Sequence, residues 1–133
     1  MPEVSTYDPK KVTVSVGGRV ITGFAADGVV TLTHNEDAVT PSVGAKGDVA
    51  YSENANNSGN AALPLMSTSS SLAYLREICA KRRPVRFSVS DVNDADAIQV
   101  SEENCRILKM PDTPRSKDPT TVTVNVYIPD LNY

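Results

Sequence analysis

The feature that most constrains the fold is the alternation of apolar and polar residues near the end of the chain. Between Thr121 and Ile128, four aliphatic side chains take every second position, and Thr, Asn and Tyr take the others. Successive side chains of a β-strand point to opposite faces of a sheet, so this pattern predicts a half-buried strand. The segment holds neither proline nor charge. Because such a strand pairs readily when it lies at a sheet edge, we expect another chain to cover it.

The same period of two recurs along the rest of the sequence. Gly17-Gly18 and Asp27-Gly28 suit tight turns, which would join the first three strands into a meander. Aromatic residues are only 5% of the chain and Trp is absent, so the core must consist of aliphatic side chains. Strands accommodate such residues well. The further strands that the pattern predicts are residues 11–16, 19–24, 29–34, 61–66, 85–90, 97–100 and 105–110.

One segment, residues 70–83, has helical spacing. Leu72, Leu75 and Ile78 lie on one side of it, and Pro84 follows its end. The Lys81-Arg82-Arg83 cluster falls in the last turn, where cations interact favourably with the helix dipole. At 133 residues the chain fits a single domain over residues 1–133. We expect a mainly β fold, a two-sheet β-sandwich or open barrel with one flanking α-helix.

Two segments lack periodicity. Residues 1–10 contain two prolines and two acids and predict an N-terminal arm. We expect a long loop over residues 35–60, in which residues 49–55 are compatible with a short polar strand. Its first part carries three acids, one proline and two glycines, with Val39 and Val43 as the apolar anchors. Because loops of this length are uncommon in compact domains, a functional role is expected for it.

The composition argues against several function classes. A net charge of −3 disfavours tight binding to phosphates, and no apolar run approaches the roughly 18 residues that a membrane helix needs. His34, the single histidine, has no partner motif for catalysis, and residues 91–96 lack the glycine and the fifth ligand of a calcium loop. Cys79 and Cys105 match no zinc spacing and are expected as reduced thiols. We therefore expect no enzymatic activity, no cofactor, no metal and no membrane contact, and a cytoplasmic origin.

Several segments from residue 7 to residue 80 appear in an order that a known family shares. They are Tyr7-Asp8-Pro9-Lys10-Lys11-Val12, a glycine-centred hairpin, Gly23-Phe24, the stretch from Glu36 to Val49, Ser58-Gly59-Asn60, and Leu65-Met66-Ser67-Thr68-Ser69 before the helix. In these segments the chain resembles the tail tube proteins of contractile-tailed bacteriophages. Residues 36–49 are the most specific part, and beyond residue 84 the likeness is one of strand pattern only.

The resemblance implies a subunit that forms hexameric rings, in which the strands join a continuous barrel lining the lumen. The rings would stack helically into a hollow tube that conducts DNA during ejection and is surrounded by a contractile sheath. Its implied partners are further copies of the chain, the tail sheath protein, the baseplate and tail terminator proteins, the tape measure protein and, transiently, DNA. The implied location is the virion tail, assembled in the host bacterial cytoplasm.

The resemblance also suggests which residues meet other subunits. An arm and a loop would contact a neighbouring subunit or ring, and the polar face of the last strand is a candidate for the lumen. The expected contact residues are Tyr7, Pro9, Glu36, Asp37, Val39, Thr40, Pro41, Val43, Gly44, Gly47 and Asp48, and the candidate lumen residues are Thr121, Thr123 and Asn125.

Other functions stay open at this point. The tube could belong to a tail-like bacteriocin or a secretion device, through which DNA need not pass. A monomeric β-sandwich binding module, for example for carbohydrate, would need an exposed aromatic platform, and the five Tyr do not cluster in sequence. A small enzyme is disfavoured because no catalytic set is found.

Overall fold

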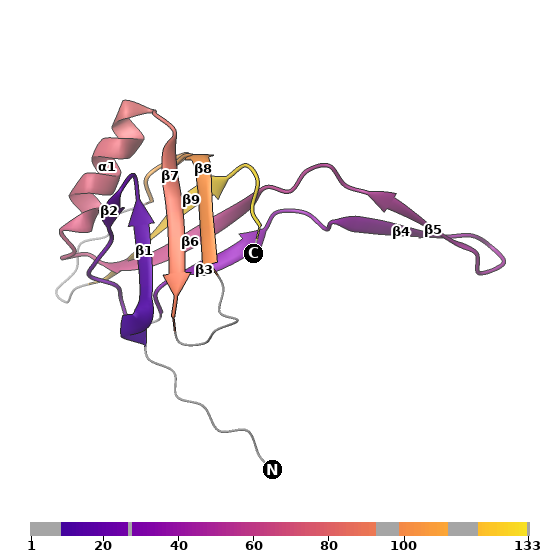
Figure 1. Cartoon of the computed structure of the whole chain (residues 1–133), viewed down its shortest axis with the longest axis horizontal. Coiled ribbons are helices and arrows are strands. Elements are labelled where there is room, and N and C mark those ends of the chain that lie inside the picture. Colours follow the sequence, from indigo (N-terminus) through magenta and orange to yellow (C-terminus); the bar gives the residue numbers. More distant parts are fainter. Residues whose placement is uncertain (1–8, 27, 93–98, 112–119, 133) are drawn as a thin grey trace, which may run out of the picture.

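The computed structural model describes residues 9–26, 28–92, 99–111 and 120–132 (Figure 1). This part of the chain forms a β-rich body from which one long hairpin projects. The elements are the 3-10 helix η1 (Pro9–Lys11), β1 (Val12–Val16), β2 (Arg19–Val20), β3 (Thr31–His34), β4 (Val39–Val43), β5 (Val49–Glu53), β6 (Gly59–Met66), α1 (Ser71–Lys81), β7 (Val85–Asp91), β8 (Gln99–Cys105) and β9 (Thr121–Ile128).

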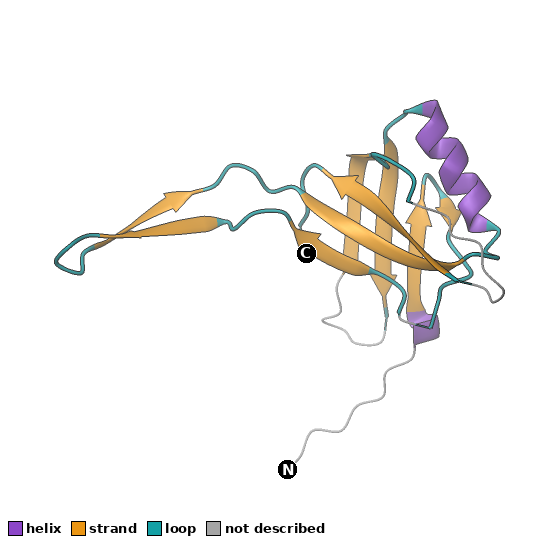
Figure 2. Ribbon diagram, turned by 180° about the vertical axis from the view of Figure 1, so that it is seen from behind, coloured by secondary structure: helices purple, strands orange, loops and turns teal. Residues whose placement is uncertain are grey.

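The body consists of two antiparallel sheets with a helix beside them. One sheet has the strand order β2-β1-β7-β8 and the other β3-β6-β9. Helix α1 flanks the side next to β2, and the hairpin β4–β5 extends from the opposite side (Figure 2). The expected fold class, mainly β with one flanking helix, is confirmed.

The core lies between the two sheets. Alternate residues of β9 from Val122 to Ile128 are buried, as are Leu63 and Leu65 of β6. Phe87 of β7 is the largest fully buried side chain among the described residues. Leu75 and its neighbours on α1 join the same cluster. The apolar residues of the period-two pattern are therefore the ones that lie on the buried face of each strand.

The sheets are linked where the chain crosses between them. Arg106, just after β8, pairs with Tyr127 of β9, and Phe24 pairs with Leu65 of β6. The expected three-strand meander is wrong, because β2 ends at Val20 and β3 pairs with β6 in the other sheet. Gly23 has a φ of 81°, a conformation that glycine adopts readily, and this bend carries the chain from one sheet to the other.

Two other boundaries differ from expectation. A single strand, β8, runs over Gln99–Cys105 where two strands were expected at residues 97–100 and 105–110. Its pairing with β7 contains a register shift, and Asn104 has a φ of 63°, so a bulge obscures the alternation. The helix was expected over residues 70–83 and spans Ser71–Lys81, because Arg82 adopts a left-handed conformation with φ 52°.

The expectation of irregular backbone over residues 35–48 is also wrong. Residues 39–43 form β4, which pairs with β5 over five residue pairs from Val39↔Glu53 to Val43↔Val49. The expected long loop 35–60 also contains the first residues of β6. Pro41 and short polar side chains conceal the strand in the sequence, because proline is rare within strands.

The buried thiol of Cys105 gives a test of the core. Burial is the main cause that raises the pKa of Cys105 to about 11, from an ordinary value of 9.0. A raised pKa means that the folded state favours the neutral thiol, so this stabilisation is complete below pH 9 and is lost as the pH rises toward 11.

We predict that wild type loses stability relative to a Cys105→Val variant between pH 9 and 11. Urea unfolding of both proteins across this range measures the difference between their free energies of unfolding. The Tyr and Lys residues are the same in both proteins, so their contributions cancel in this difference. A difference in the free energy of unfolding that stays constant through this range would contradict the burial of Cys105.

Gly59, at the start of β6, gives a second test. A methyl group at this position would lie 2.7 Å from the carbonyl oxygen of Thr33 and would also overlap the side chain of Leu131. We predict that Gly59→Ala lowers the free energy of unfolding by about 2–3 kcal/mol, because the backbone must shift. In Gly44→Ala the nearest atom lies 3.6 Å away, so this control variant should keep the wild-type midpoint in urea.

Candidate assembly interface

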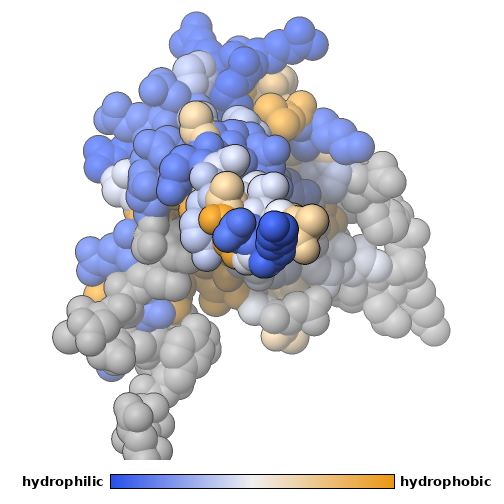
Figure 3. All heavy atoms as spheres, turned by 90° about the vertical axis from the view of Figure 1, so that its right-hand side faces the viewer, coloured by the Kyte–Doolittle hydropathy of each residue, from blue (hydrophilic) through white to orange (hydrophobic). Residues whose placement is uncertain are grey.

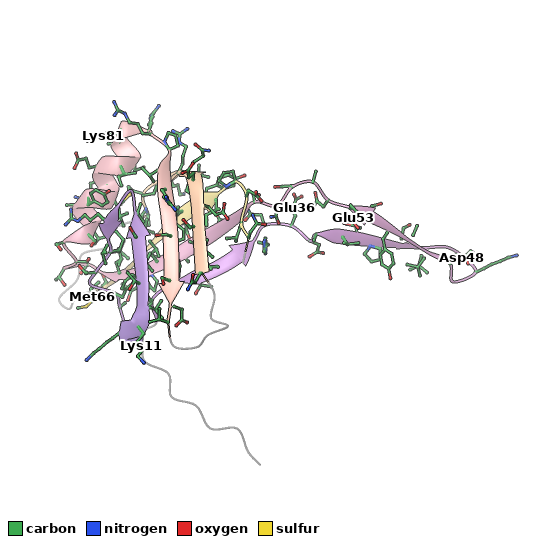
Figure 4. The ribbon with its side chains drawn as sticks, viewed as in Figure 1. Lys11, Glu36, Asp48, Glu53, Met66 and Lys81 are labelled. Atoms are coloured by element: carbon green, nitrogen blue, oxygen red, sulfur yellow. The ribbon has the colours of Figure 1, made fainter. Side chains whose placement is uncertain are left out.

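The hairpin β4–β5 projects from the body as a two-stranded ribbon. At its tip the Gly44 N–H donates to the Asp48 carbonyl at 2.7 Å, and the Gly47 N–H donates to the Gly44 carbonyl at 3.0 Å. Gly47 has a φ of 90°, which a residue with a side chain rarely adopts. Figure 4 shows Asp48 at the far end, with Glu36 and Glu53 closer to the body. The sequence-predicted Gly44, Gly47 and Asp48 therefore form the tip of a regular hairpin.

The ribbon has two chemically different faces. Residues that pair across antiparallel strands share a face, so Val39↔Glu53, Pro41↔Tyr51 and Val43↔Val49 lie together. On this apolar face the exposed fractions of Val43, Val49 and Tyr51 are 68%, 50% and 71%. The opposite face carries small residues, namely Thr40, Ser42, Ala50 and Ser52. Viewed from the side of the hairpin, the tip has hydrophilic atoms with hydrophobic ones beside them (Figure 3).

No part of the described chain covers the apolar face of the hairpin. A two-stranded hairpin is at best marginally stable in water without a third strand or a packed layer. Exposed apolar surface on a folded protein commonly marks an interaction site. The hairpin therefore has the properties of an element that is stabilised by binding to another surface.

Asparagine side chains hold the stem of the hairpin. The Asn35 amide donates to the Ser58 hydroxyl at 3.1 Å, and the Asn54 amide donates to the Asp37 carbonyl at 3.0 Å. The Asn56 amide donates to the Glu36 carboxylate. These bonds tie the two segments of the stem to each other, so the ribbon leaves the body in a fixed direction.

The C-terminal segment closes over the base of the stem. Leu131 is fully buried, and its N–H donates to the Asn57 carbonyl at 2.9 Å. The Asn57 amide donates to the Asp130 carboxylate at 2.8 Å and to the Leu131 carbonyl at 3.0 Å. A ring nitrogen of His34 lies 2.9 Å from the same carbonyl. The single histidine thus takes part in a structural contact between β3 and the C-terminal segment.

On the outer face of the sheet β3-β6-β9 the strands themselves carry no charged side chain, and Lys109 lines a pocket beside Asn125 and Tyr127. The candidate lumen residues Thr121, Thr123 and Asn125 are exposed on this face. The strand register places the neutral side chains of the neighbouring strands beside them. The ten side chains of the face are Thr31, Thr33, Asn60, Ala62, Pro64, Met66, Thr121, Thr123, Asn125 and Tyr127.

Strand β9 lies at the edge of this sheet. The backbone N–H and C=O of Tyr127 point away from β6 and pair with Arg106 at 2.7 and 3.0 Å. The same alternation turns the backbone groups of Thr123 and Asn125 toward this outer edge. Among the described residues, the structure shows no backbone partner for them there. Most of the uncharged edge is therefore open to pairing with a strand from another chain.

Most of the remaining predicted contact residues lie in the stem of the hairpin or on β4. Tyr7 lies outside the described residues, and Pro9 begins η1. Glu36 and Asp37 lie in the stem, and Val39, Thr40, Pro41 and Val43 lie on β4. Val49 and Tyr51 were not predicted as apolar contact residues, although they alternate with Ala50 and Ser52 in the segment expected as a polar strand.

The described residues do not gather a chemical centre. Among them, no group of three or more His, Cys, Asp or Glu side chains is placed to hold a metal ion. Within the same residues, every buried polar side-chain atom has a hydrogen-bond partner. None of the helices in this part of the chain combines the length and apolar character needed to cross a membrane.

Comparison with known proteins finds similarity at the level of the fold. No protein-family model and no curated protein sequence matches the chain. The sheath/tube terminator of the extracellular contractile injection system PVC, in its extended state, matches with a TM-score of 0.54 and 14% identity over 99% of this chain and 96% of that chain. The tube-terminating cap of the anti-feeding prophage matches with a TM-score of 0.55 and 10% identity over 99% of this chain and 93% of that chain. The chain thus shares its fold with proteins that end the tubes of contractile injection systems.

Proposed function

We propose that the chain is a non-enzymatic structural subunit of a contractile tail, and that its copies form hexameric rings that stack into the inner tube. The observation that carries this proposal is the projecting hairpin with its uncovered apolar face. The fold shared with a tube terminator and a tube-terminating cap supports the same class of function. The resemblance of residues 7–80 to phage tail tube proteins supports the specific role of tube subunit.

The shape of the molecule favours assembly of identical copies. The hairpin projects from the side of the body opposite α1, so a surface that receives it would lie on another molecule (Figure 1). A contact between two different surfaces of the same protein is heterologous, and it closes into a ring when its rotation allows. The hairpin, with Val39, Pro41, Val43 and Asp48, would be the reaching element, and the arm with Tyr7 and Pro9 would tether the adjacent ring.

A tube also accounts for the open edge of β9. Closing a sheet into a barrel removes its edges, and strands from six copies would form one continuous wall. The uncharged face with Thr121, Thr123 and Asn125 would then line the lumen. Affinity for DNA comes mainly from cations that neutralise phosphates, so a neutral wall would let DNA pass without binding it.

The proposed partners follow from this role. They are the tail sheath outside the tube, the baseplate and terminator proteins at its ends, and the tape measure protein and DNA inside. The proposed location is the virion tail. The tube of a tail-like bacteriocin or secretion device would use the same contacts without DNA.

A second candidate role is that of the terminator itself. Both structural neighbours are described as ending a tube. A chain in this role would form single rings, because a cap must not be extended by further rings. Electron microscopy of the purified chain separates the two roles. Stacked tubes with a central bore would establish the tube subunit, single rings would establish the terminator, and dispersed monomers at high concentration would overturn both.

The apolar face of the hairpin gives a specific prediction. We expect Val43→Lys combined with Tyr51→Lys to abolish rings and tubes, because the charges replace apolar contact surface. The free energy of unfolding should change by less than about 0.5 kcal/mol, since both residues are exposed. Thr40→Lys combined with Ser52→Lys places the same charge on the other face and should assemble. Equal assembly of the two variants, measured by sedimentation velocity, would contradict a role for the apolar face.

A further inference from the structure

An open hollow lies at the C-terminal end of α1, where the end of the helix meets the segment after β8. Its wall combines apolar and basic groups, and Leu108 within it has an exposed fraction of 69%. The Arg106 guanidinium donates to the carbonyl of Arg82 at 3.0 Å, which joins the end of the helix to the segment after β8. The residues that line the hollow are Cys79, Ala80, Arg82, Arg106, Ile107 and Leu108.

The hollow is lined by two arginines, Arg82 and Arg106, although the chain as a whole is acidic. Three carboxylates lie in this region, and one of them, Glu77, pairs with Lys81 at 2.8 Å. The others, Glu102 and Glu103, lie on β8 across from the first half of β7. Favourable interaction with the helix dipole extends only over the last turn, so it does not explain the cations that follow the helix. Arg82 and Arg106 line the hollow itself, and Lys81, Arg83 and Arg86 lie within four residues of Arg82 in the sequence.

The hairpin has the opposite charge. Between Glu36 and Glu53 four carboxylates face a single cation, Lys46. Glu53 borders the apolar face beside Val39, and Asp48 lies at the tip. The hairpin thus presents apolar side chains with carboxylates around them, and the hollow presents apolar side chains with guanidinium groups around them. These two surfaces are complementary in both respects.

We propose that the hollow at the end of α1 receives the acidic hairpin of a second copy of this chain. Figure 4 places Asp48 and Lys81 at opposite ends of the molecule, so one copy cannot satisfy its own contact. Each copy therefore donates a hairpin at one end and accepts one at the other, as a heterologous contact requires. This inference rests on the proposed self-assembly and adds to it the surface that receives the hairpin.

A second copy fits the hollow better than nucleic acid does. A phosphate backbone would neutralise Arg82 and Arg106 and would leave the exposed Leu108 uncovered. The hairpin supplies carboxylates and also apolar side chains such as Tyr51 and Val43. Complementary charges at a protein interface mainly determine the rate of encounter and the choice of partner, which makes them suitable for experimental exchange.

Two charge-reversed proteins test the contact. In the first, Arg82→Glu and Arg106→Glu reverse the hollow, and in the second, Asp48→Lys and Glu53→Lys reverse the hairpin. Each protein alone meets like charge at the contact, so the concentration needed for assembly should rise at least about tenfold. In an equimolar mixture every hairpin finds a hollow of opposite charge in the other protein, and assembly should return to nearly the wild-type concentration.

Controls separate this contact from other effects of charge. Arg19→Glu combined with Thr13→Glu lowers the net charge by three on β1 and β2, outside the residues that line the hollow, and should assemble normally. Arg106 donates a hydrogen bond to the end of the helix, so its substitution could destabilise the fold. If thermal unfolding shows this for the first charge-reversed protein, a protein with Arg82→Glu and Arg83→Glu is used in its place. Adding a short duplex DNA to wild type tests the alternative ligand, and displacement of assembly by DNA at ordinary salt would overturn the proposal.

The outcomes distinguish failure of the proposed contact from failure of the proposed function. Reversed proteins that assemble alone as well as wild type, or a mixture that fails to assemble, would overturn the proposed contact and leave the tube subunit intact. A wild-type protein that stays monomeric at every concentration would overturn the proposed function itself. Loss of assembly in each protein with recovery in the mixture is the result that supports the contact.

Discussion

The two-stranded hairpin β4–β5 exposes an apolar face that no other element of the described chain covers. In a sandwich, apolar strand faces are buried against a second sheet, and the body of this protein does so with β1, β6, β7 and β9. The hairpin β4–β5 extends beyond that body and has no second layer. Its apolar side chains stay exposed unless another molecule covers them. A monomer with this hairpin is therefore an incomplete unit, whatever the details of its assembly.

The body supports the hairpin and sets its direction. Asparagine side chains bridge the two segments of the stem, and the C-terminal segment places Leu131 into the core beneath it. Each of these contacts joins segments that are far apart in sequence. Direction matters because a heterologous contact closes into a ring of defined size only when the angle between subunits is reproducible. In the proposed assembly, the polar network of the stem would set the direction in which the apolar face is presented.

The sequence predicts the half-buried strands well because their alternation records one buried and one exposed face. The expected bounds of β9, Thr121–Ile128, agree with the structure to the residue, and β1 differs by one. Strand β4 of the hairpin was not predicted, because it buries no face in the core and contains Pro41, whereas β5 was expected as a short polar strand over residues 49–55. Val39, Pro41 and Val43 were predicted as apolar contact residues from the sequence and the family resemblance. Val49 and Tyr51, which share their face of the hairpin, were not predicted. The crossover at Gly23 and the asparagine network of the stem depend on tertiary contacts, which a pattern within one strand does not report.

If a neighbouring copy covers the hairpin, assembly should slow the hydrogen exchange of its backbone amides. In dilute monomer the amides of residues 39–53 should exchange rapidly, because the ribbon is only marginally stable alone. In the assembled protein the same amides should be protected by at least about tenfold, and those of β6 and β9 should be slow in both states. Hairpin amides that exchange at the same rate before and after assembly would contradict the account.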